Sequence, residues 1–264
     1  MRLTVRHVDV HAIDQGHGSP VLLLHGNPDT CEVWQPVIDG LRATHRCLAP
    51  DLPGFGRSAA LQPADYSIEN MGRWVEDFVQ AAGVDGPLDL VVHDIGGPLG
   101  LAWAVMHPQR VRRLAILDTA FHSDYRWHFW GRVWRTPLLG ELSMALLNRT
   151  GFRMELRRGS RKLTRAQIDE TFDRMHPTMK RTVLAIYRAA DPWKLAGWDE
   201  RLLQLTADKP AIVLWGDRDP YLPRSLAERF GARRVRHFAD CGHWVQLEEA
   251  AEVTRELQAF FNER

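Results

Sequence analysis

Short apolar runs alternate with amphipathic stretches along most of the chain. The runs at 21–24 and 88–92 are apolar throughout, as expected of strands that are covered on both faces. Between them, residues 67–82 place apolar side chains at helical spacing behind Ser67, a residue type that often caps helices. The same reasoning predicts further strands at 46–49, 111–117, 211–215 and 234–238, and further helices at 30–41, 98–107 and 248–261. We therefore expect an α/β fold, a mostly parallel sheet with helices on both faces.

The alternation stops between residues 121 and 207, where the pattern is helical and rich in Arg and Trp. We expect a helical cap over residues 121–207, inserted between a first core part at 1–120 and a second at 208–264. Such a cap would cover the carboxyl ends of the strands, where open α/β sheets bind ligands. Five of the ten tryptophans fall in this segment, which indicates an aromatic-lined cavity: Trp127, Trp130, Trp134, Trp193 and Trp198.

An aspartate follows the predicted strand 88–92 at a sharp turn. The segment Val92-His93-Asp94-Ile95-Gly96-Gly97 leads from this strand into a helix, and its two glycines allow the helix to approach the strand closely. The helix dipole favours the ionised form of a carboxylate in this position. Asp94 is therefore either a helix cap or the exposed nucleophile of a strand–turn–helix elbow.

Three further segments follow strands in the order that such an elbow requires. His25-Gly26-Asn27-Pro28 comes directly after the first apolar strand, two acids follow the strand 211–215, and His243 precedes the last helix. The order nucleophile, acid, histidine is that of an α/β-hydrolase triad, in which the acid orients the imidazole. We favour Asp219 over Asp217 as this acid, and Asp118, at the end of the strand 111–117, is a further candidate.

These segments resemble the haloalkane dehalogenase and epoxide hydrolase branch of the α/β-hydrolase superfamily, over residues 20–120 and 208–262. The resemblance implies an α/β-hydrolase fold in which Asp94 attacks a saturated carbon and becomes esterified. Water activated by His243 then hydrolyses the ester, while the backbone N–H groups of Asn27 and Ile95 hold the oxyanion. This mechanism needs neither a metal nor an organic cofactor.

The leaving group separates two reactions, of which we prefer carbon–halogen hydrolysis. Dehalogenases bind halide with an Asn in the HGN position, here Asn27, and with a Trp directly after the nucleophile. Ile95 occupies that second position and has no side-chain donor, a loss of about 1.5–3 kcal/mol for a hydrogen bond to a charged group. A tryptophan of the expected cap, Trp127 or Trp130, is a candidate replacement.

The alternative reaction is epoxide opening, in which cap side chains protonate the leaving oxygen. Tyr187 resembles one such acid, and Tyr125 or His128 is a candidate for the second. Strained lactones are a further substrate type for the same carboxylate. A non-catalytic small-molecule-binding protein of this fold is disfavoured because nucleophile, acid and base are all available. A reductase is also disfavoured, because the glycines at 54 and 56 lack the full dinucleotide-binding fingerprint.

Net charge, cysteine spacing and the apolar runs limit which binding partners and which cellular compartment are expected. The formal net charge of +1 gives no sign of a nucleic-acid partner. The resemblance implies a small apolar substrate, a haloalkane or an epoxide, together with water. The three cysteines, Cys31, Cys47 and Cys241, have neither disulfide nor zinc spacing, which favours a reducing compartment. Residues 1–10 lack the apolar block of a signal peptide, and no apolar run approaches a membrane span. We expect a cytoplasmic monomer or homodimer with no membrane partner.

Overall fold

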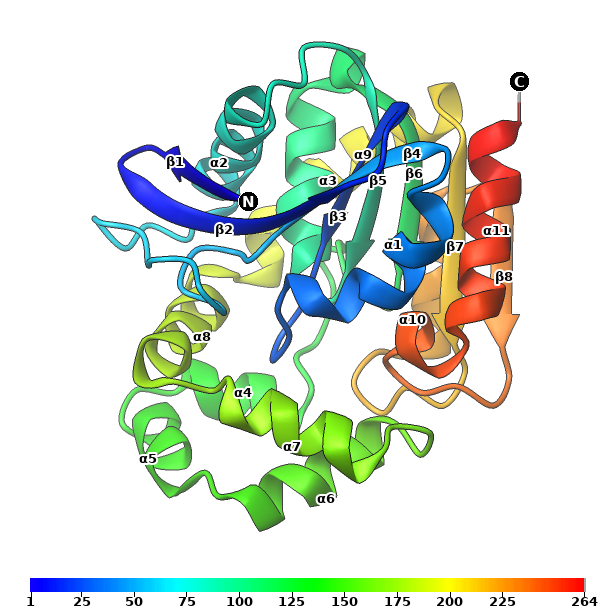
Figure 1. Ribbon diagram of the computed structural model, residues 1–264. Coiled ribbons are helices and arrows are strands. Elements are labelled where there is room, and N and C mark those ends of the chain that lie inside the picture. Colours follow the sequence, from blue (N-terminus) through cyan, green and yellow to red (C-terminus); the bar gives the residue numbers. More distant parts are fainter. Residues whose placement is uncertain (264) are drawn as a thin grey trace.

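The computed structural model describes residues 1–263, which form one eight-stranded sheet with helices on both faces (Figure 1). The strand order is β1-β2-β4-β3-β5-β6-β7-β8. Only the β1–β2 and β2–β4 pairs are antiparallel, and all other neighbours are parallel. The strands are β1 (Arg2–Val5), β2 (Val8–Gln15), β3 (Ser19–Leu24), β4 (His45–Pro50), β5 (Leu88–His93), β6 (Val111–Leu117), β7 (Ala211–Gly216) and β8 (Arg234–Phe238). The expected mostly parallel α/β sheet is confirmed.

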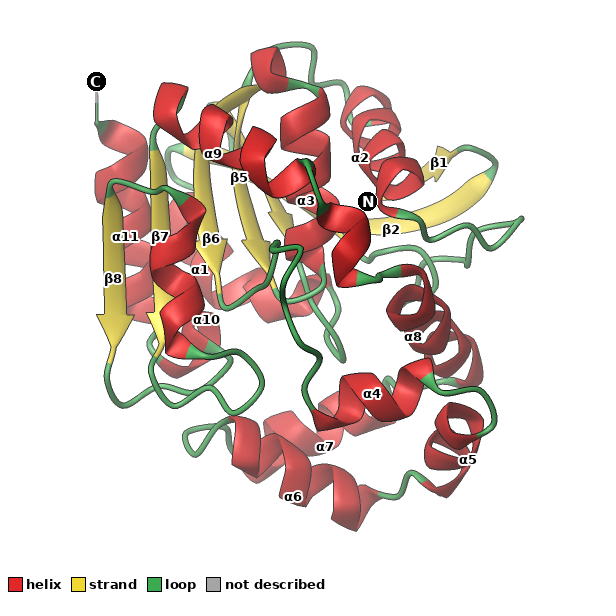
Figure 2. Ribbon diagram, turned by 180° about the vertical axis from the view of Figure 1, so that it is seen from behind, coloured by secondary structure: helices red, strands yellow, loops and turns green. Residues whose placement is uncertain are grey.

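Two layers of helices cover the sheet, one on each face (Figure 1, Figure 2). One layer holds α1 (Gln35–Leu41), α10 (Val245–Glu248) and α11 (Ala250–Asn262), and the other holds α2 (Ile68–Ala81), α3 (Gly96–Met106) and α9 (Trp198–Asp208). Two buried apolar clusters fill the two interfaces between helices and sheet. Helix α3 is apolar on all sides because it packs between α2, α9 and the strands.

The helix boundaries differ from expectation at two places. The expected helix at 30–41 starts as a 3-10 turn at Cys31–Trp34 and becomes α-helical only from Gln35, directly before Pro36. A proline fits there because the first turn of a helix has no partner for its backbone N–H. The expected helix at 248–261 is divided into α10 and α11, and Glu249 lies between them.

Only helices lie between β6 and β7. They are α4 (Phe129–Arg135), α5 (Leu139–Leu146), α6 (Arg149–Gly159), α7 (Arg165–Asp173), α8 (Pro177–Ala189) and α9, with a 3-10 turn at Pro192–Leu195. Helices α4 to α8, called the cap helices below, form a group beyond the carboxyl ends of the strands (Figure 2). Helix α9 packs against α3 on the sheet. The domain limits 121–207 stay a prediction.

Within residues 1–263, no helix combines the length and the apolar character needed to cross a bilayer.

Candidate active site

Asp94 sits at the apex of a tight turn between β5 and α3. Its φ of +48° is a left-handed conformation that costs energy in a non-glycine residue and is typical of functional sites. The turn is fixed by the backbone N–H of Asp94, which donates to the Asp118 carbonyl at 3.1 Å, and by the Thr119 hydroxyl, which donates to the Asp94 carbonyl at 2.6 Å. A Cβ on Gly96 would lie 2.5 Å from the His25 carbonyl oxygen, so the close approach of α3 requires glycine there.

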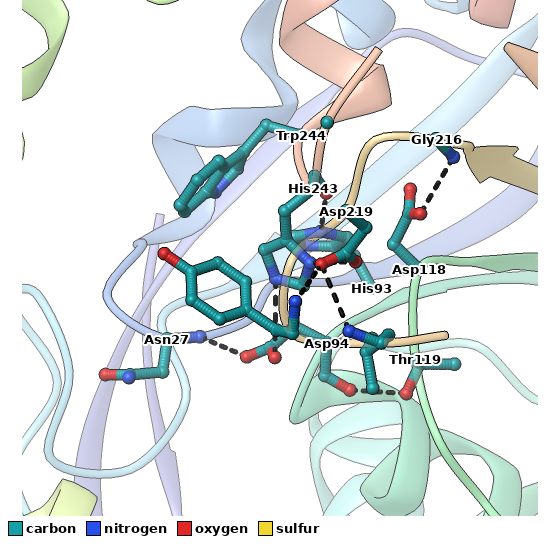
Figure 3. A network of polar contacts seen from close by, with 12 residues as sticks. Asn27, His93, Asp94, Asp118, Thr119, Gly216, Asp219, His243 and Trp244 are labelled. Atoms are coloured by element: carbon teal, nitrogen blue, oxygen red, sulfur yellow. Dashed lines mark hydrogen bonds and ion pairs between the residues drawn. The ribbon is translucent and has the colours of Figure 1, made fainter. Parts of the chain in front are cut away.

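The loop after β3 holds one oxygen of the Asp94 carboxylate. The Asn27 backbone N–H donates to Asp94 Oδ1 at 2.7 Å (Figure 3). Gly26 makes this approach possible, because any Cβ at that position would collide with the Asp94 side chain. Ile95 lies at the start of α3 and is 7% exposed, with its side chain in a cavity wall. The donor side chain that a halide site would place at position 95 is therefore missing from this wall.

His243 lies between Asp94 and Asp219. Its Nδ1–H donates to Asp219 Oδ2 at 2.7 Å, and its Nε2 is 3.5 Å from Asp94 Oδ2 (Figure 3). The second Asp219 oxygen accepts the backbone N–H groups of Tyr221 and Leu222 at 2.7 and 3.2 Å, which fixes the carboxylate. The structure thus brings together the nucleophile, base and acid expected from the sequence order.

The two other candidate acids have different partners. Asp217 accepts from His237 at 2.6 Å and pairs with Arg224 at 3.2 Å. Asp118 accepts the Gly216 backbone N–H at 2.9 Å and is fully buried. Neither makes a hydrogen bond to His243, so the geometry favours Asp219 as the orienting acid.

The Asp94–His243 pair is charged at rest. Burial would raise the pKa of Asp94, but the hydrogen bond and charge of His243 and the Asn27 N–H outweigh burial, and this pKa falls to about 2. Burial would lower the pKa of His243, yet the neighbouring Asp219 and Asp94 carboxylates raise it well above its usual value. The Asp94 carboxylate is therefore ionised, and esterification of it would remove a negative charge that raises the pKa of His243.

Three buried residues around the pair were not singled out from the sequence. His93 Nε2–H donates to the His243 carbonyl at 2.8 Å, and burial lowers the His93 pKa to about 3, so this ring is neutral. Trp244 Nε1–H donates to Asp29 at 2.9 Å, which ties the loop that carries Asn27 to the loop that carries His243. Asp29 directly follows the HGNP segment and Trp244 directly follows His243, so adjacency to the motifs was the available signal.

Asp29 supplies a stability test. Burial raises its pKa from 3.8 to about 7, although the Trp244 hydrogen bond lowers it in part. The folded protein therefore holds this proton where the unfolded chain has lost it, so the Asp29 contribution to stability falls as pH rises from about 4 to about 7. Asp29→Asn keeps a carbonyl acceptor and removes the charge. We expect it to raise the free energy of unfolding by about 1–3 kcal/mol near pH 8 and little near pH 4.

Denaturant unfolding of wild type and Asp29→Asn at both pH values measures this effect. Trp244→Phe is the matched control for Asp29→Asn. It removes the indole N–H that donates to Asp29, so it should lower the free energy of unfolding. An equal change in stability at both pH values for Asp29→Asn would contradict the assignment of a buried, titrating carboxyl.

Two cavities lie on either side of the Asp94 site. The smaller, about 90 Å³, runs between α2, α3 and α8, and the larger, about 560 Å³, lies under α4, α5 and α6. Both are mostly apolar, and four side chains line both of them: Asp94, His128, Tyr187 and Tyr221. A substrate at Asp94 therefore has apolar space in two directions.

Three of the five tryptophans of the expected cap line these cavities together with the expected Tyr and His side chains, whereas Trp193 and Trp198 line neither cavity. Trp127 and Tyr125 line the smaller one, Trp130 the larger one, and His128 and Tyr187 both. The indole N–H of Trp127 is buried and has no partner among residues 1–263, whereas Trp130 stacks on Trp134 at 6.0 Å. Burial raises the pKa of Tyr187 well above its usual value, so its hydroxyl is a neutral donor beside the Asn27 side chain.

One group in the described part of the chain has metal-ligand chemistry. His11, Cys31 and Asp51 place one ligand atom each within 4.8 Å of one another, away from Asp94. Both Asp51 oxygens already accept backbone N–H groups, those of Cys31 and Arg57 at 2.8 Å each. This cluster is therefore explained as a structural hydrogen-bond site.

Comparison with known proteins shows which proteins and which family this chain resembles. The chain is 29% identical to a cis-3-alkyl-4-alkyloxetan-2-one decarboxylase of Xanthomonas campestris over 96% of its own length and 92% of the relative. It is also 29% identical to haloalkane dehalogenase 2 of Mycobacterium tuberculosis over 90% of its length and 86% of the relative. The Cif epoxide hydrolase of Acinetobacter nosocomialis shares the fold, with a TM-score of 0.81 at 20% identity over 98% of this chain and 88% of that one. The alpha/beta hydrolase fold family model matches residues 19–250, and the chain belongs to this family.

Proposed function

We propose that the protein opens a strained oxetan-2-one ring by attack of Asp94 on the saturated ring carbon that carries the oxygen. The observation that carries the proposal is an ionised carboxylate at the junction of two apolar cavities. A carboxylate is a poor nucleophile for acyl transfer but can displace a leaving group at a saturated carbon that is held in line with it.

The leaving group explains why no halide-binding side chain is needed at position 95. In an oxetan-2-one the departing atom is the oxygen of a carboxylate, a stable anion that needs no acid to protonate it. In an epoxide the departing atom is an alkoxide oxygen, which needs a proton donor. The isoleucine at position 95 is compatible with the first case, because the departing carboxylate shares its charge between two oxygens and needs no side-chain donor at that position.

The two cavities favour a reacting carbon in the middle of an apolar chain. A ring that carries one alkyl group on each of two adjacent carbons would place one group in the cavity of about 90 Å³ and the other in that of about 560 Å³. Their unequal size predicts unequal alkyl groups. The relatives named for 3-alkyl-4-alkyloxetan-2-ones match 96% of this chain, and this supports the same substrate class.

The reaction balances without a co-reactant. Asp94 Oδ2 forms a bond to the ring carbon, and the carbon–oxygen bond of the ring breaks to give a β-carboxylate ester. The carbon–carbon bond to the substrate's new carboxylate then breaks and releases CO₂. The electron pair of that bond forms the alkene, and the bond between the substrate carbon and Asp94 Oδ2 breaks, which regenerates the Asp94 carboxylate. His243, 3.5 Å from Oδ2, would stabilise the returning charge.

The stereochemistry follows from backside attack. The entering Asp94 oxygen lies opposite the ring oxygen and therefore anti to the carboxylate that departs, so a cis ring should give a cis alkene.

The test supplies a cis-3,4-dialkyl-oxetan-2-one to wild type and to Asp94→Asn, and follows products by gas chromatography. We expect cis-alkene and CO₂ from wild type only, with the variant slower by at least about 10³-fold. A hydroxy acid in place of alkene would show that the ester is hydrolysed, and equal turnover by Asp94→Asn would exclude Asp94 as the nucleophile.

Carbon–halogen hydrolysis, the reaction preferred from the sequence, stays the second candidate. Two observations favour it: the Asn27 side chain lies at the site, and the buried indole N–H of Trp127 has no partner in the described chain. Halide release from a haloalkane panel by wild type, lost in Trp127→Phe, would place this reaction first. Styrene oxide in the same panel tests epoxide opening, for which Tyr187 is the proposed acid.

A further inference from the structure

Helix α5 presents a row of leucines to solvent. Leu142 and Leu146 are four residues apart and lie on one side of α5, Leu138 directly precedes the helix, and the three are 53%, 67% and 82% exposed in that order. Met154 on the next helix, α6, is 68% exposed. Single exposed apolar residues are common, but several of them on consecutive helices indicate an interaction site. These four residues are called the apolar rim below.

The apolar rim is continuous with the larger cavity. Leu146 and Met154 also line that cavity, whose lining at the other end includes Asp94 and His243. Helices α5 and α6 lie at the outer end of the cap, away from the sheet (Figure 1, Figure 2). An apolar molecule that enters between the rim residues would therefore reach Asp94 through a mostly apolar cavity.

The segment around the rim is strongly basic. Residues 126–165 contain ten Arg and Lys but only two Glu and no Asp, although the whole chain has 34 basic and 33 acidic residues. Several of these cations are neutralised by carboxylates, among them Arg149 and Arg153, which pair with Asp173 and Asp169 on the adjacent helix α7. Arg132, Arg157 and Arg161 are exposed and form no ion pair with the described part of the chain. Arg157 follows Met154 by three residues, so it lies on the same side of α6.

We infer that the apolar rim docks on an anionic lipid surface, from which apolar substrates enter the larger cavity. Apolar side chains beside Arg and Lys are the combination that binds lipid interfaces, because the apolar groups enter the acyl boundary while the cations meet the headgroups. A second copy of the chain fits less well, since two such faces would bring like charges together. This surface association requires no membrane-spanning helix.

The binding test uses the full chain and vesicles that contain no substrate. Vesicles of phosphatidylcholine with about 30% phosphatidylglycerol should co-sediment the wild type, and vesicles of phosphatidylcholine alone should bind at least about five-fold less. The double variant Leu138→Asn/Leu142→Gln should lower binding at least about ten-fold. Leu138 directly precedes α5 and is 82% exposed, so a polar side chain of similar size at this position should not disturb the fold.

Two further variants make the test specific. Leu203→Gln on α9 is the matched control, because it removes another leucine that is 45% exposed and lies outside the rim, and it should bind like wild type. Arg132→Gln/Arg157→Gln should weaken binding to the anionic vesicles and reduce its dependence on salt.

The outcome is separable from that of the proposed reaction, because vesicle binding is measured without turnover and should persist in Asp94→Asn. The leucine variant should keep wild-type activity on a short, water-soluble substrate and lose activity on a long-chain substrate presented in vesicles. Absence of co-sedimentation with anionic vesicles overturns the inference. A concentration-dependent dimer that the leucine variant abolishes, without any vesicle binding, would instead assign the rim to self-association and would equally overturn it.

Discussion

Replacement of His243 by glutamine should leave a stable covalent ester on Asp94 after exposure to an alkyl electrophile that carries no carboxylate. Such an ester cannot lose CO₂, so hydrolysis is its only exit, and hydrolysis needs a base to activate water. Esterification removes the charge of Asp94, which lowers the pKa of His243 toward that of a working base. Without this imidazole we expect ester hydrolysis to slow by about 10³-fold or more.

Intact-mass spectrometry after exposure to 1,2-dibromoethane and, separately, to styrene oxide measures the adduct, and peptide mapping locates it. Asp94→Asn is the control and should give no adduct. An adduct on another residue, or a variant that turns over at the wild-type rate, would refute the role proposed for His243. The choice of electrophile that forms the adduct also ranks the two hydrolytic candidates.

The second large effect is expected from Asp219→Asn. Asp219 accepts Nδ1–H of His243 at 2.7 Å and is held by two backbone N–H groups, so it fixes the imidazole in one orientation. An asparagine can present its NH₂ to Nδ1 and so favour the wrong tautomer. We expect kcat for substrates that need ester hydrolysis to fall by about 10²–10⁴-fold, with KM changed little.

Two matched variants separate this effect from a general loss of acidic charge. Asp217→Asn breaks contacts with His237 and Arg224 but leaves His243 untouched, so kcat should stay within about three-fold of wild type. Asp118→Asn keeps a carbonyl acceptor for the Gly216 N–H. A larger loss in Asp118→Asn than in Asp219→Asn would move the orienting role to Asp118. Circular dichroism and thermal unfolding establish that each variant is folded.

The sequence predicted six of the eight strands and the positions of the candidate site residues, because both depend on local signals, but it did not predict β1 and β2. Apolar runs gave β3, β5, β6, β7 and β8 to within two residues at each end. The segments with Asn27, Asp94, Asp219 and His243 all follow strands, and parallel strands deliver such segments to a single edge of the sheet. The sequence already favoured Asp219 over Asp217, and the hydrogen bonds agree, because Asp219 accepts from His243 and Asp217 accepts from His237.

Features that depend on packing between distant segments were not accessible from the sequence. The bond between Asp29 and Trp244 spans 215 residues, and the two cavities are bounded by helices on both sides of Asp94. The leucines of α5 resemble ordinary core positions in sequence, and only the fold shows that they face solvent. The expectation of no membrane partner rested on the absence of an apolar segment long enough to span a bilayer. That criterion does not test for peripheral binding through exposed side chains such as those of the apolar rim.

The hydrogen bond from the Asn27 backbone N–H determines which oxygen of the Asp94 carboxylate is exchanged during turnover. Because Oδ1 is held by that amide, Oδ2 is the atom free to attack, and in a hydrolytic cycle it would depart with the product while water supplies its successor. Each product would then carry the oxygen acquired one cycle earlier. In a cycle that ends by loss of CO₂, the same carboxylate would keep both of its original atoms indefinitely. Labelling of the Asp94 carboxylate during turnover in ¹⁸O water would thus distinguish the hydrolytic reaction from the decarboxylation.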